Sequence, residues 1–334
     1  MAAWAVCEPG PLGSRPLRLV ERPVPEPGDR QVRIKVDVCG VCRTDLHLAE
    51  GDLEPRRPGV IPGHEAVGRV DRVGPACTRL QPGRRVGVAW LAASCGRCRF
   101  CRRGSENLCT RPTFTGWDVD GGYAQYLVAD ERFVYALPDS FDDVSAAPLL
   151  CAGIIGFRAL RLAEVPAGGR LGIYGFGGSA HLTAQVAVAE GLTVHVLTRS
   201  AAARDLALAL GAASARDASE APPELLDAAI LFAPAGGLVP VALSALDRGG
   251  TLAVAGIHVS QIPSLDYRAH LFQERRLRSV TANTRQDGAD FLALAARLGI
   301  EPVTAAYDFA EADRALSDLA HGRVKGAAVI RVNP

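Results

Sequence analysis

Four cysteines crowd into a short stretch of the chain, and their spacing is regular. They are Cys95, Cys98, Cys101 and Cys109, separated by two, two and seven residues. Four thiolates at such intervals can surround one ion, and a tetrahedral shell of four sulfurs is typical of structural zinc. We therefore expect a zinc-stabilised lobe at residues 93–112, with no open coordination position and no catalytic role. Four free cysteines or a redox pair are the alternatives.

A second set of metal-ligating residue types is spread over three segments. Its members are Cys39, His64, Glu65 and Cys151. Two thiolates, an imidazole and a carboxylate are the donors that a catalytic zinc uses while one position stays open for water or substrate. The spacing is loose, so the residue types alone favour a catalytic zinc site and a set of unrelated core residues equally.

A glycine-rich turn follows the apolar segment 171–174 and opens a helical pattern. It matches the dinucleotide-binding pattern G-x-G-x-x-G, with alanine in place of the third glycine. Missing side chains let the backbone approach a pyrophosphate at the positive end of a helix. We therefore expect a dinucleotide to be bound by Gly175, Gly177, Gly178, Ser179 and Ala180.

The next strand bears on which dinucleotide is bound. An NAD site presents Asp or Glu to the ribose 2′-hydroxyl about 20 residues after the glycines. Here the segment 193–197 ends in Thr198-Arg199-Ser200, with no acid. A carboxylate would repel a 2′-phosphate, whereas Arg199 and Arg204 would attract one, so NADP(H) is favoured over NAD(H). The alternative is that Arg199 is one more surface arginine.

The secondary-structure elements that must position these motifs follow two different sequence patterns. Residues 32–38 alternate strictly between apolar and polar, which predicts a half-buried strand, and residues 1–147 are strand-rich throughout. Later, apolar strands alternate with alanine-rich helical stretches, the signature of a parallel sheet covered on both faces. These strands are expected at 171–174, 193–197, 227–232, 251–257 and 277–282. A last strand at 327–332 could return to the first domain.

Composition limits the class of protein. At 334 residues, two domains are expected, and 48% hydrophobic with 22% charged residues is ordinary globular usage. A net charge of +1 gives no field for nucleic acid or an anionic membrane. The sequence shows no apolar run near 18 residues and no signal peptide, so we expect a cytoplasmic protein whose nine cysteines are reduced.

The sequence resembles the zinc-dependent alcohol dehydrogenases of the medium-chain dehydrogenase/reductase superfamily, particularly their bacterial primary-alcohol branch, over essentially its whole length. The most specific motif is Gly63-His64-Glu65-x2-Gly68-x5-Gly74-x2-Cys77, in which Cys77 replaces the usual valine. The resemblance implies an α/β fold: a GroES-like, strand-rich catalytic domain at 1–147 and 287–334, interrupted by a Rossmann domain with a doubly wound parallel sheet at 148–286.

The resemblance also implies roles for residues around the catalytic zinc. Cys39, His64 and Cys151 would be its fixed ligands, and Glu65 would enter the shell when water leaves. Asp45 would orient His64, because an outer carboxylate fixes the tautomer and raises the basicity of a ligating histidine.

The proton relay and the substrate pocket are implied in the same way. Thr44 and His47 match the family's relay, and Trp90 falls where the family places an aromatic wall. Trp117 is a weaker candidate, and for both tryptophans core packing is an equal alternative. Leu53 stands where a bulky tryptophan narrows the pocket of small-alcohol enzymes, which suggests more room.

The function implied is reversible hydride transfer between a nicotinamide cofactor and a primary alcohol, medium-chain or aromatic, or its aldehyde. Two zinc ions per chain and a homo-oligomer, dimer or tetramer, are implied with it, but no nucleic-acid or membrane partner. A cinnamyl-alcohol-type NADPH-dependent reductase is the nearest alternative. A zinc-free quinone or enoyl reductase of the same fold and a zinc-knuckle nucleic-acid binder are more distant ones.

Overall fold

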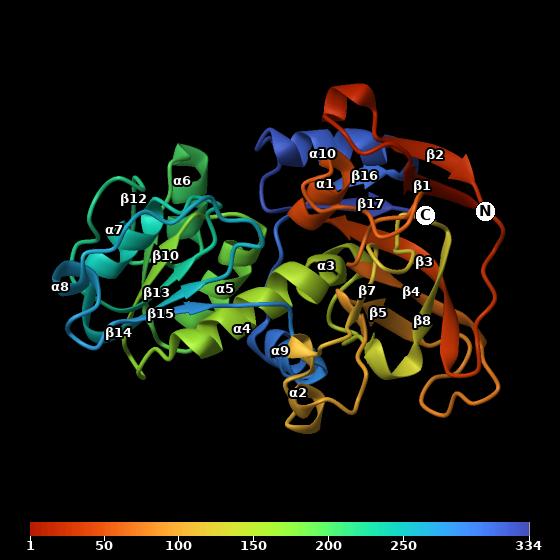
Figure 1. Cartoon of the computed structure of the whole chain (residues 1–334), viewed down its shortest axis with the longest axis horizontal. Helices are drawn as coiled ribbons and strands as arrows, with labels where there is room; N and C mark the ends of the chain where they lie inside the picture. The colour runs from red at the N-terminus through yellow and green to blue at the C-terminus, as the bar shows by residue number, and fades with distance from the viewer. Residues whose placement is uncertain (334) are drawn as a thin grey trace. The chain divides into compact units, whose positions relative to one another are not determined.

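The computed structural model of the chain describes residues 1–333, which divide into two compact units (Figure 1). The first unit comprises residues 1–151, 282–296 and 302 onward, and the second comprises residues 152–281 and 297–301. The chain therefore leaves the first unit after Cys151, builds the second, and returns to complete the first.

The first unit is organised around one long strand, β3 (Gln31–Val41), whose residues Val32, Ile34 and Val36 are buried. The main sheet has the order β16-β17-β3-β4-β5-β9, and β8 also pairs with β3. The other strands of this unit are β1 (Ala2–Val6), β2 (Leu17–Glu21), β4 (Ala66–Val73), β5 (Arg85–Val88), β6 (Leu91–Ala93), β7 (Thr113–Phe114), β8 (Tyr126–Asp130), β9 (Val134–Ala136), β16 (Thr304–Asp308) and β17 (Ala327–Arg331).

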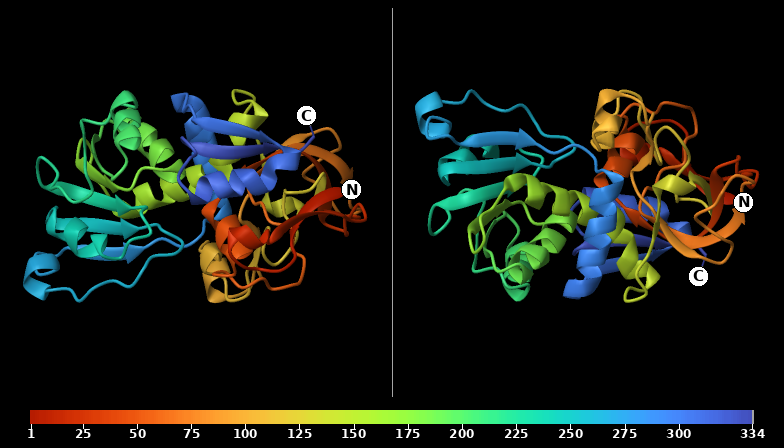
Figure 2. Two further views of the ribbon diagram at one scale, coloured as in Figure 1. Left: turned by 90° about the horizontal axis from the view of Figure 1, so that it is seen from above. Right: turned by 90° about the horizontal axis from the view of Figure 1, so that it is seen from below.

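The last segment of the chain completes this sheet. Strand β17 runs antiparallel to β3, with Val329 opposite Gly40, and β16 runs parallel to β17. Helix α10 (Ala312–Ala320) connects the two and packs against them (Figure 2). The unit also contains α1 (Arg43–Glu50), α2 (Arg99–Arg102), α3 (Asp143–Pro148) and most of α9 (Arg285–Leu298).

The second unit is a six-stranded parallel sheet with the order β12-β11-β10-β13-β14-β15. Its strands are β10 (Arg170–Tyr174), β11 (Thr193–Leu197), β12 (Ser214–Arg216), β13 (Leu226–Leu231), β14 (Leu246–Val254) and β15 (Arg276–Ser279). Its helices are α4 (Ile154–Ala163), α5 (Gly178–Ala189), α6 (Ala201–Ala209), α7 (Leu238–Ser244) and α8 (Tyr267–His270).

The strand order reverses between β10 and β13. From β10 the chain moves outward through α5 to β11, and from β13 it moves the other way through α7 to β14. Because parallel crossovers are right-handed, opposite directions of travel place the two helices on opposite faces of the sheet. The structure therefore confirms the predicted α/β fold with a strand-rich unit and a doubly wound parallel sheet, and in such sheets ligands bind outside the strand ends at a reversal of this kind.

One helical stretch within residues 1–333, Asp143–Ala163, is long and apolar enough to cross a membrane by length and composition. The sequence analysis does not anticipate it, because no single run of apolar residues is that long. Most of it, 67% of the apolar window, is buried inside the protein, as in a core helix. It joins α3 to α4 through one π-helical turn, Leu149–Gly153.

Candidate active site and metal centres

The four-cysteine lobe brings its sulfurs together as the spacing predicts. The Sγ atoms of Cys95, Cys98, Cys101 and Cys109 all lie within 4.8 Å of one another. Backbone N–H groups point at these sulfurs: that of Cys98 lies 3.4 Å from Cys95 Sγ, and that of Cys95 lies 3.3 Å from Cys109 Sγ. Such N–H groups stabilise thiolate charge, so the four sulfurs fit a structural zinc ion.

The electrostatics of the lobe are uneven. The N–H of Cys101, which caps α2 onto Cys98, lowers the pKa of the Cys98 thiol to about 5. Burial raises the pKa of Cys101 to about 11. A zinc ion bound here would be held by Cys98 as a ready thiolate and would displace the proton of Cys101.

A second group of donor atoms gathers inside the first unit. Its members are Cys42, His64, Glu65 and Cys151, with one donor atom from each within 4.8 Å of all the others. His64 Nε2 lies 3.3 Å from Cys151 Sγ, and the sulfurs of Cys42 and Cys151 lie 3.9 Å apart. Two thiols, an imidazole and a carboxyl group fit a catalytic zinc ion.

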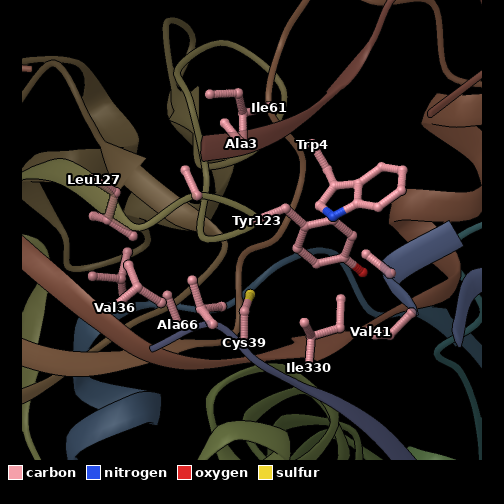
Figure 3. Packing of buried hydrophobic residues seen from close by; sticks show 14 of the residues in the cluster. Ala3, Trp4, Val36, Cys39, Val41, Ile61, Ala66, Tyr123, Leu127 and Ile330 are labelled. Atoms are coloured by element: carbon pink, nitrogen blue, oxygen red, sulfur yellow. The ribbon is translucent and has the colours of Figure 1, made fainter. Parts of the chain in front are cut away.

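Cys39 is not a member of this group, so the expectation that it is a zinc ligand is corrected: the thiol there belongs to Cys42. Cys39 Sγ lies in the hydrophobic core near Tyr123 and Ile330 (Figure 3), and it donates to Gly40 O at 3.5 Å. Burial, followed by the charge of Asp45, raises the pKa of Cys39 well above its usual value. Because its Sγ lies in the core and is not among the clustered donor atoms, Cys39 is not placed to bind the same ion.

Glu65 reaches the group because the neighbouring strand has a glycine. A Cβ added to Gly40 would lie 2.0 Å from Glu65 Oε2, so any larger residue in β3 would displace the carboxyl group. Burial, and then the nearby charge of Cys42, raises the pKa of Glu65 well above its ordinary value. The structure therefore holds a carboxyl group beside the thiols with little exposure to water.

The carboxylate of Asp45 contacts several groups of the site. Its Oδ2 accepts hydrogen bonds from the backbone N–H of Cys42 at 2.9 Å and the hydroxyl of Tyr123 at 3.3 Å. Its Oδ1 accepts from the N–H of Gly63 at 3.0 Å and lies 3.4 Å from His64 Nδ1. Cys42 is also the N-cap of α1, and Asp45 completes its capping box. One carboxylate thus fixes a thiol ligand and the orientation of an imidazole.

Charges in the metal-free site are interdependent. A hydrogen bond from Cys151 lowers the pKa of Cys42 well below its usual value, and the same contact raises that of Cys151. Burial opposes the charged form of His64, but the charges of Asp45 and Cys42 outweigh it and raise its pKa well above normal. The site therefore favours one thiolate beside an imidazolium.

Thr44 and His47 lie on the same short helix, α1. Thr44 is buried, and its Oγ1 lies 3.6 Å from Cys42 Sγ, a member of the donor group. His47 is more exposed, and its Nδ1 lies 3.0 Å from Asp52 Oδ2. One residue of the proposed pair therefore touches the site, and the other is held by a carboxylate that the sequence analysis missed.

An aromatic cluster stands beside His64. The ring of Trp90 makes an edge contact with the imidazole at 4.9 Å and stacks on Phe114 at 4.8 Å and on Trp117 at 6.0 Å. Trp117 donates its Nε1–H to Glu54 O, next to Leu53 in the chain. Both predicted tryptophans thus belong to one cluster next to a zinc-ligand candidate, and Phe114 is a member that sequence reasoning missed.

The predicted dinucleotide turn lies at the strand-order reversal of the second unit. Gly175 has a φ of 86°, and a Cβ there would lie 2.9 Å from Ala233, which follows β13. Helix α5 then begins with no side chain capping it at Gly177, and Ala180 is fully buried beneath. The residues placed together are Gly175, Gly177, Gly178, Ser179 and Ala180. Open N–H groups at a helix start suit a phosphate.

The two predicted arginines differ in their surroundings. Arg204 Nη1 donates to Thr198 O at 2.9 Å and to Arg199 O at 3.0 Å, and lies 3.5 Å from Asp217 Oδ2. The guanidinium of Arg204 therefore stabilises the loop after β11. Arg199 is exposed and has no ion pair within residues 1–333.

Two residues of the catalytic group escaped the sequence analysis as functional residues. Cys42 directly precedes Arg-Thr-Asp in the sequence and is the N-cap of α1. That position next to Thr44 and Asp45 could have indicated that its thiol lies in the site. Tyr123 follows a Gly-Gly pair, and its hydroxyl reaches Asp45 inside the core. Nothing in the spacing of Tyr123 indicates that contact, because it depends on folding of residues 78 positions apart.

Comparisons with known proteins agree with this site. Residues 28–139 match the alcohol dehydrogenase GroES-like domain. The chain is 56% identical to the probable alcohol dehydrogenase AdhA of Mycobacterium tuberculosis (strain CDC 1551 / Oshkosh), covering 99% of this chain and 97% of that protein.

Solved structures agree as well. A cinnamyl alcohol dehydrogenase from Sorghum bicolor superposes with a TM-score of 0.89 at 30% identity, covering 99% of this chain and 97% of that one. A crystal structure of CAD from Helicobacter pylori complexed with NADP(H) gives 0.89 at 26% identity, with the same coverage. Together with the two zinc-fitting donor groups, this likeness places the chain among the zinc-dependent alcohol dehydrogenases of the medium-chain dehydrogenase/reductase superfamily, oxidoreductases that act on CH–OH donors.

Proposed function

We propose that this alcohol dehydrogenase prefers NADP(H) and interconverts primary medium-chain or aromatic alcohols and their aldehydes. The observation that carries the cofactor preference is Arg199, an exposed guanidinium without an ion pair at the carboxyl end of β11. At that place an NAD enzyme of this fold presents a carboxylate. A planar guanidinium binds a phosphate through paired hydrogen bonds, so Arg199 suits a 2′-phosphate.

The rest of the loop supports the same preference. Asp217 is the acid nearest to it, but its carboxylate accepts from the N–H of Ser219 at 3.0 Å and faces Arg204. Bonding to Ser219, followed by the charge of Arg204, keeps the pKa of Asp217 low, so it is ionised and engaged. The N-cap of α6 is Ser200, whose hydroxyl would add a donor for a phosphate.

The substrate class rests on the aromatic cluster. Trp90, Trp117 and Phe114 offer near-parallel ring faces, with interplanar angles of 9° between the tryptophans and 19° between Trp90 and Phe114. Flat apolar walls next to His64 favour an aromatic ring or an alkyl chain over a small polar alcohol. Leu53 is smaller than the tryptophan of small-alcohol relatives and leaves the wall more open.

The residues divide the catalytic work as follows. Cys42, His64 and Cys151 would hold a zinc ion, which supplies Lewis acidity that favours loss of the hydroxyl proton of a bound alcohol. The carboxylate of Asp45 lies 3.4 Å from Nδ1 of His64, on the side of the ring away from the thiols, and Nε2 lies 3.3 Å from Cys151 Sγ. The buried hydroxyl of Thr44 accepts the hydrogen bond of the substrate hydroxyl and orients it.

Proton and hydride leave by different routes. The hydroxyl proton passes from Thr44 toward His47, whose partial exposure connects it to solvent. The carbon-bound hydrogen leaves as hydride to the nicotinamide cofactor, which carries the redox step. The alcohol thus loses one proton and one hydride and becomes the aldehyde, and reduction is the reverse.

The proposal includes a homo-oligomer, dimer or tetramer, in the cytoplasm. Exposed apolar side chains gather between residues 257 and 277 of the second unit, and β15 is exposed along its whole length. An apolar patch of this kind next to a free strand edge marks an association surface. Light scattering on the eluting protein would give the number of chains.

Initial rates of aldehyde reduction with NADPH and NADH test the cofactor preference. We expect NADPH to be preferred, and Arg199→Gln to raise the KM for NADPH by about tenfold, because a charge-assisted hydrogen bond is lost. Arg248→Gln, at another exposed arginine of the second unit, is the control and should change neither constant. An NADH preference in the wild type would refute the proposal.

A cinnamyl-alcohol-type reductase is the second candidate. It is favoured by the likeness to the Sorghum bicolor enzyme and by the aromatic wall at Trp90. Paired rates with cinnamaldehyde and a linear aldehyde of similar length separate the two. Cinnamaldehyde favoured more than tenfold in kcat/KM would select this candidate, and equal rates would select the broader primary-alcohol enzyme.

A further inference from the structure

A row of positive side chains crosses three neighbouring strands of the first unit, away from the residues assigned to catalysis. Lys35 on β3 stands directly opposite Arg69 on β4, and Arg69 stands directly opposite Arg85 on β5. Like charges placed directly opposite each other in an antiparallel pair are destabilising. The sheet therefore carries an electrostatic cost here, unless something negative offsets it.

The same ladder shows how such a cost is offset elsewhere. Arg33 on β3 stands opposite Arg72 on β4, another pair of like charges. The carboxylate of Glu26 bridges this pair, at 2.9 Å from Arg33 and 2.5 Å from Arg72, and Asp71 adds a contact to Arg33 at 2.6 Å. The neighbouring pair is thus neutralised by the protein's own acids.

No such bridge exists for the row that begins at Lys35. Within residues 1–333, Lys35, Arg69 and Arg331 form no ion pair, and these three exposed side chains line one cavity of about 380 Å³ that is open to solvent. Lys35 is also one of only two lysines in the chain. Arg85 is paired through Nε with Asp143 Oδ1 at 2.6 Å, but its Nη2 is buried without a hydrogen-bond partner.

Two acids share the cavity and set its net charge. Asp143 is engaged by Arg85, and Asp37, a residue of β3, lines the cavity without an ion pair within residues 1–333. Burial, and then repulsion by Asp143, raises the pKa of Asp37, so its negative charge is disfavoured here. Lys35, Arg69 and Arg331 against Asp37 and Asp143 leave one positive charge among the lining residues, and Arg85, which is paired with Asp143, adds a second one beside them.

We propose that this cavity is a binding site for a small dianion, a phosphate group or a dicarboxylate, which bridges Lys35, Arg69 and Arg331 as Glu26 bridges the neighbouring arginines. A cavity of this size accommodates the anion together with a small organic part. The site lies on β3 and α3, which lead in the sequence to Cys42 and Cys151. Its occupancy therefore stabilises the strand and the helix that directly precede two of the zinc-binding thiols.

The experiment uses the zinc-loaded enzyme in phosphate-free buffer at constant ionic strength. Inorganic phosphate is titrated while the melting temperature is recorded and binding heat is measured. We expect saturable stabilisation, because a ligand that binds only the folded state raises the apparent stability with its concentration. Lys35→Gln and Arg331→Gln should each weaken phosphate binding by about tenfold or more through loss of a charge-assisted contact.

A second prediction separates this site from a general salt effect. In anion-free buffer Lys35→Gln should melt at the same or a higher temperature than the wild type, because it removes the repulsion with Arg69. Arg84→Gln, at an exposed arginine of the same unit outside the row, should respond to phosphate as the wild type does.

Arg199→Gln should also keep the full phosphate response, which distinguishes this site from the cofactor site. The proposal is overturned if phosphate has no effect, or if Lys35→Gln responds to phosphate as fully as Arg84→Gln and the wild type do. It is also overturned if Lys35→Gln is less stable than the wild type without anion. Malonate as a second probe assigns the ligand class: a stronger response to phosphate indicates a phosphoryl group, and a stronger response to malonate indicates a dicarboxylate.

Discussion

The two metal centres use similar ligands in opposite surroundings. The lobe of Cys95, Cys98, Cys101 and Cys109 is assembled within a short stretch of chain, and its sulfurs are held by backbone N–H groups of the same stretch. The catalytic group is gathered from residues as far as 109 positions apart and is buried around Asp45. A local site can form as soon as its metal binds, whereas the distant one needs the folded sheet first.

The difference has a chemical side as well. The lobe supplies four sulfurs, which fill a tetrahedral shell, so its zinc has no place for substrate. The catalytic group replaces two of the sulfurs by an imidazole and a carboxyl group, and its outer contacts come from a carboxylate and a tyrosine. Damage to the four-cysteine centre should therefore lower the stability of the protein, whereas damage to the catalytic group should lower the turnover rate.

The largest effect is expected at Cys42. Cys42→Ser should lower kcat/KM by more than about 1,000-fold, because a zinc ligand contributes more than the 10–100-fold of an outer partner. The matched control is Cys39→Ser, whose hydroxyl would be buried in the core at a cost of about 1–3 kcal/mol but which should keep near-normal turnover. Rates and zinc content of both variants check this, and the reverse pattern would restore Cys39 as the ligand.

Cys101→Ser should disrupt the four-cysteine centre. We expect a loss of more than about 4 kcal/mol in the free energy of unfolding, in the range seen when a structural metal is lost. The fraction that remains folded should turn over at the wild-type rate per catalytic zinc. Urea unfolding monitored beside activity measures both, and normal stability with lost activity would reverse the roles of the two sites.

Zinc affinity should rise steeply with pH at the catalytic centre. In the metal-free site His64 and Cys151 hold protons, since both pKa values are raised, and zinc binding must release them. Two protons released means up to about 100-fold in affinity per pH unit below those pKa values. Reloading the metal-free enzyme with zinc across pH, with proton release followed by an indicator dye, gives the slope; a flat profile would show that the donors are already deprotonated.

The smallest effect is expected at Asp45. Asp45→Asn keeps the shape but weakens the pairing with His64 Nδ1, and should cost about 10–100-fold in zinc affinity or kcat/KM. Tyr123→Phe, which removes one contact to the same carboxylate, should have a smaller effect in the same direction. Unchanged zinc binding and unchanged rate in Asp45→Asn would mean that the carboxylate only caps α1.

The strand positions were largely predictable because burial follows alternation closely. Residues 193–197 form a strand with the predicted bounds, and the parallel order follows from the alternation of strands with helices. The short strands β12 and β16 were not predicted. Both are three to five residues long and only partly buried, so their sequences carry little periodicity.

The ligand set shows where periodicity fails. Strict alternation from Val32 predicts that Val36 and Val38 point into the core. In the structure, however, the core face continues at Cys39 and Val41. The reason is a register shift between Val36 and Val38, which changes which face the later residues occupy. A sequence pattern cannot locate such a bulge, and therefore cannot tell which of two nearby cysteines reaches the site.

The π-helical turn at Leu149–Gly153 makes the catalytic centre sensitive to the number of residues in the chain. Such a turn holds one residue more than an α-helical turn, and Cys151 is its middle member. Deleting one residue there would let the helix become regular, but every later residue would move by one position and turn by about 100°. Substitutions can be tolerated in this segment more readily than a change in its length. Among relatives, an insertion or deletion in this turn should therefore mark the chains that have lost the metal.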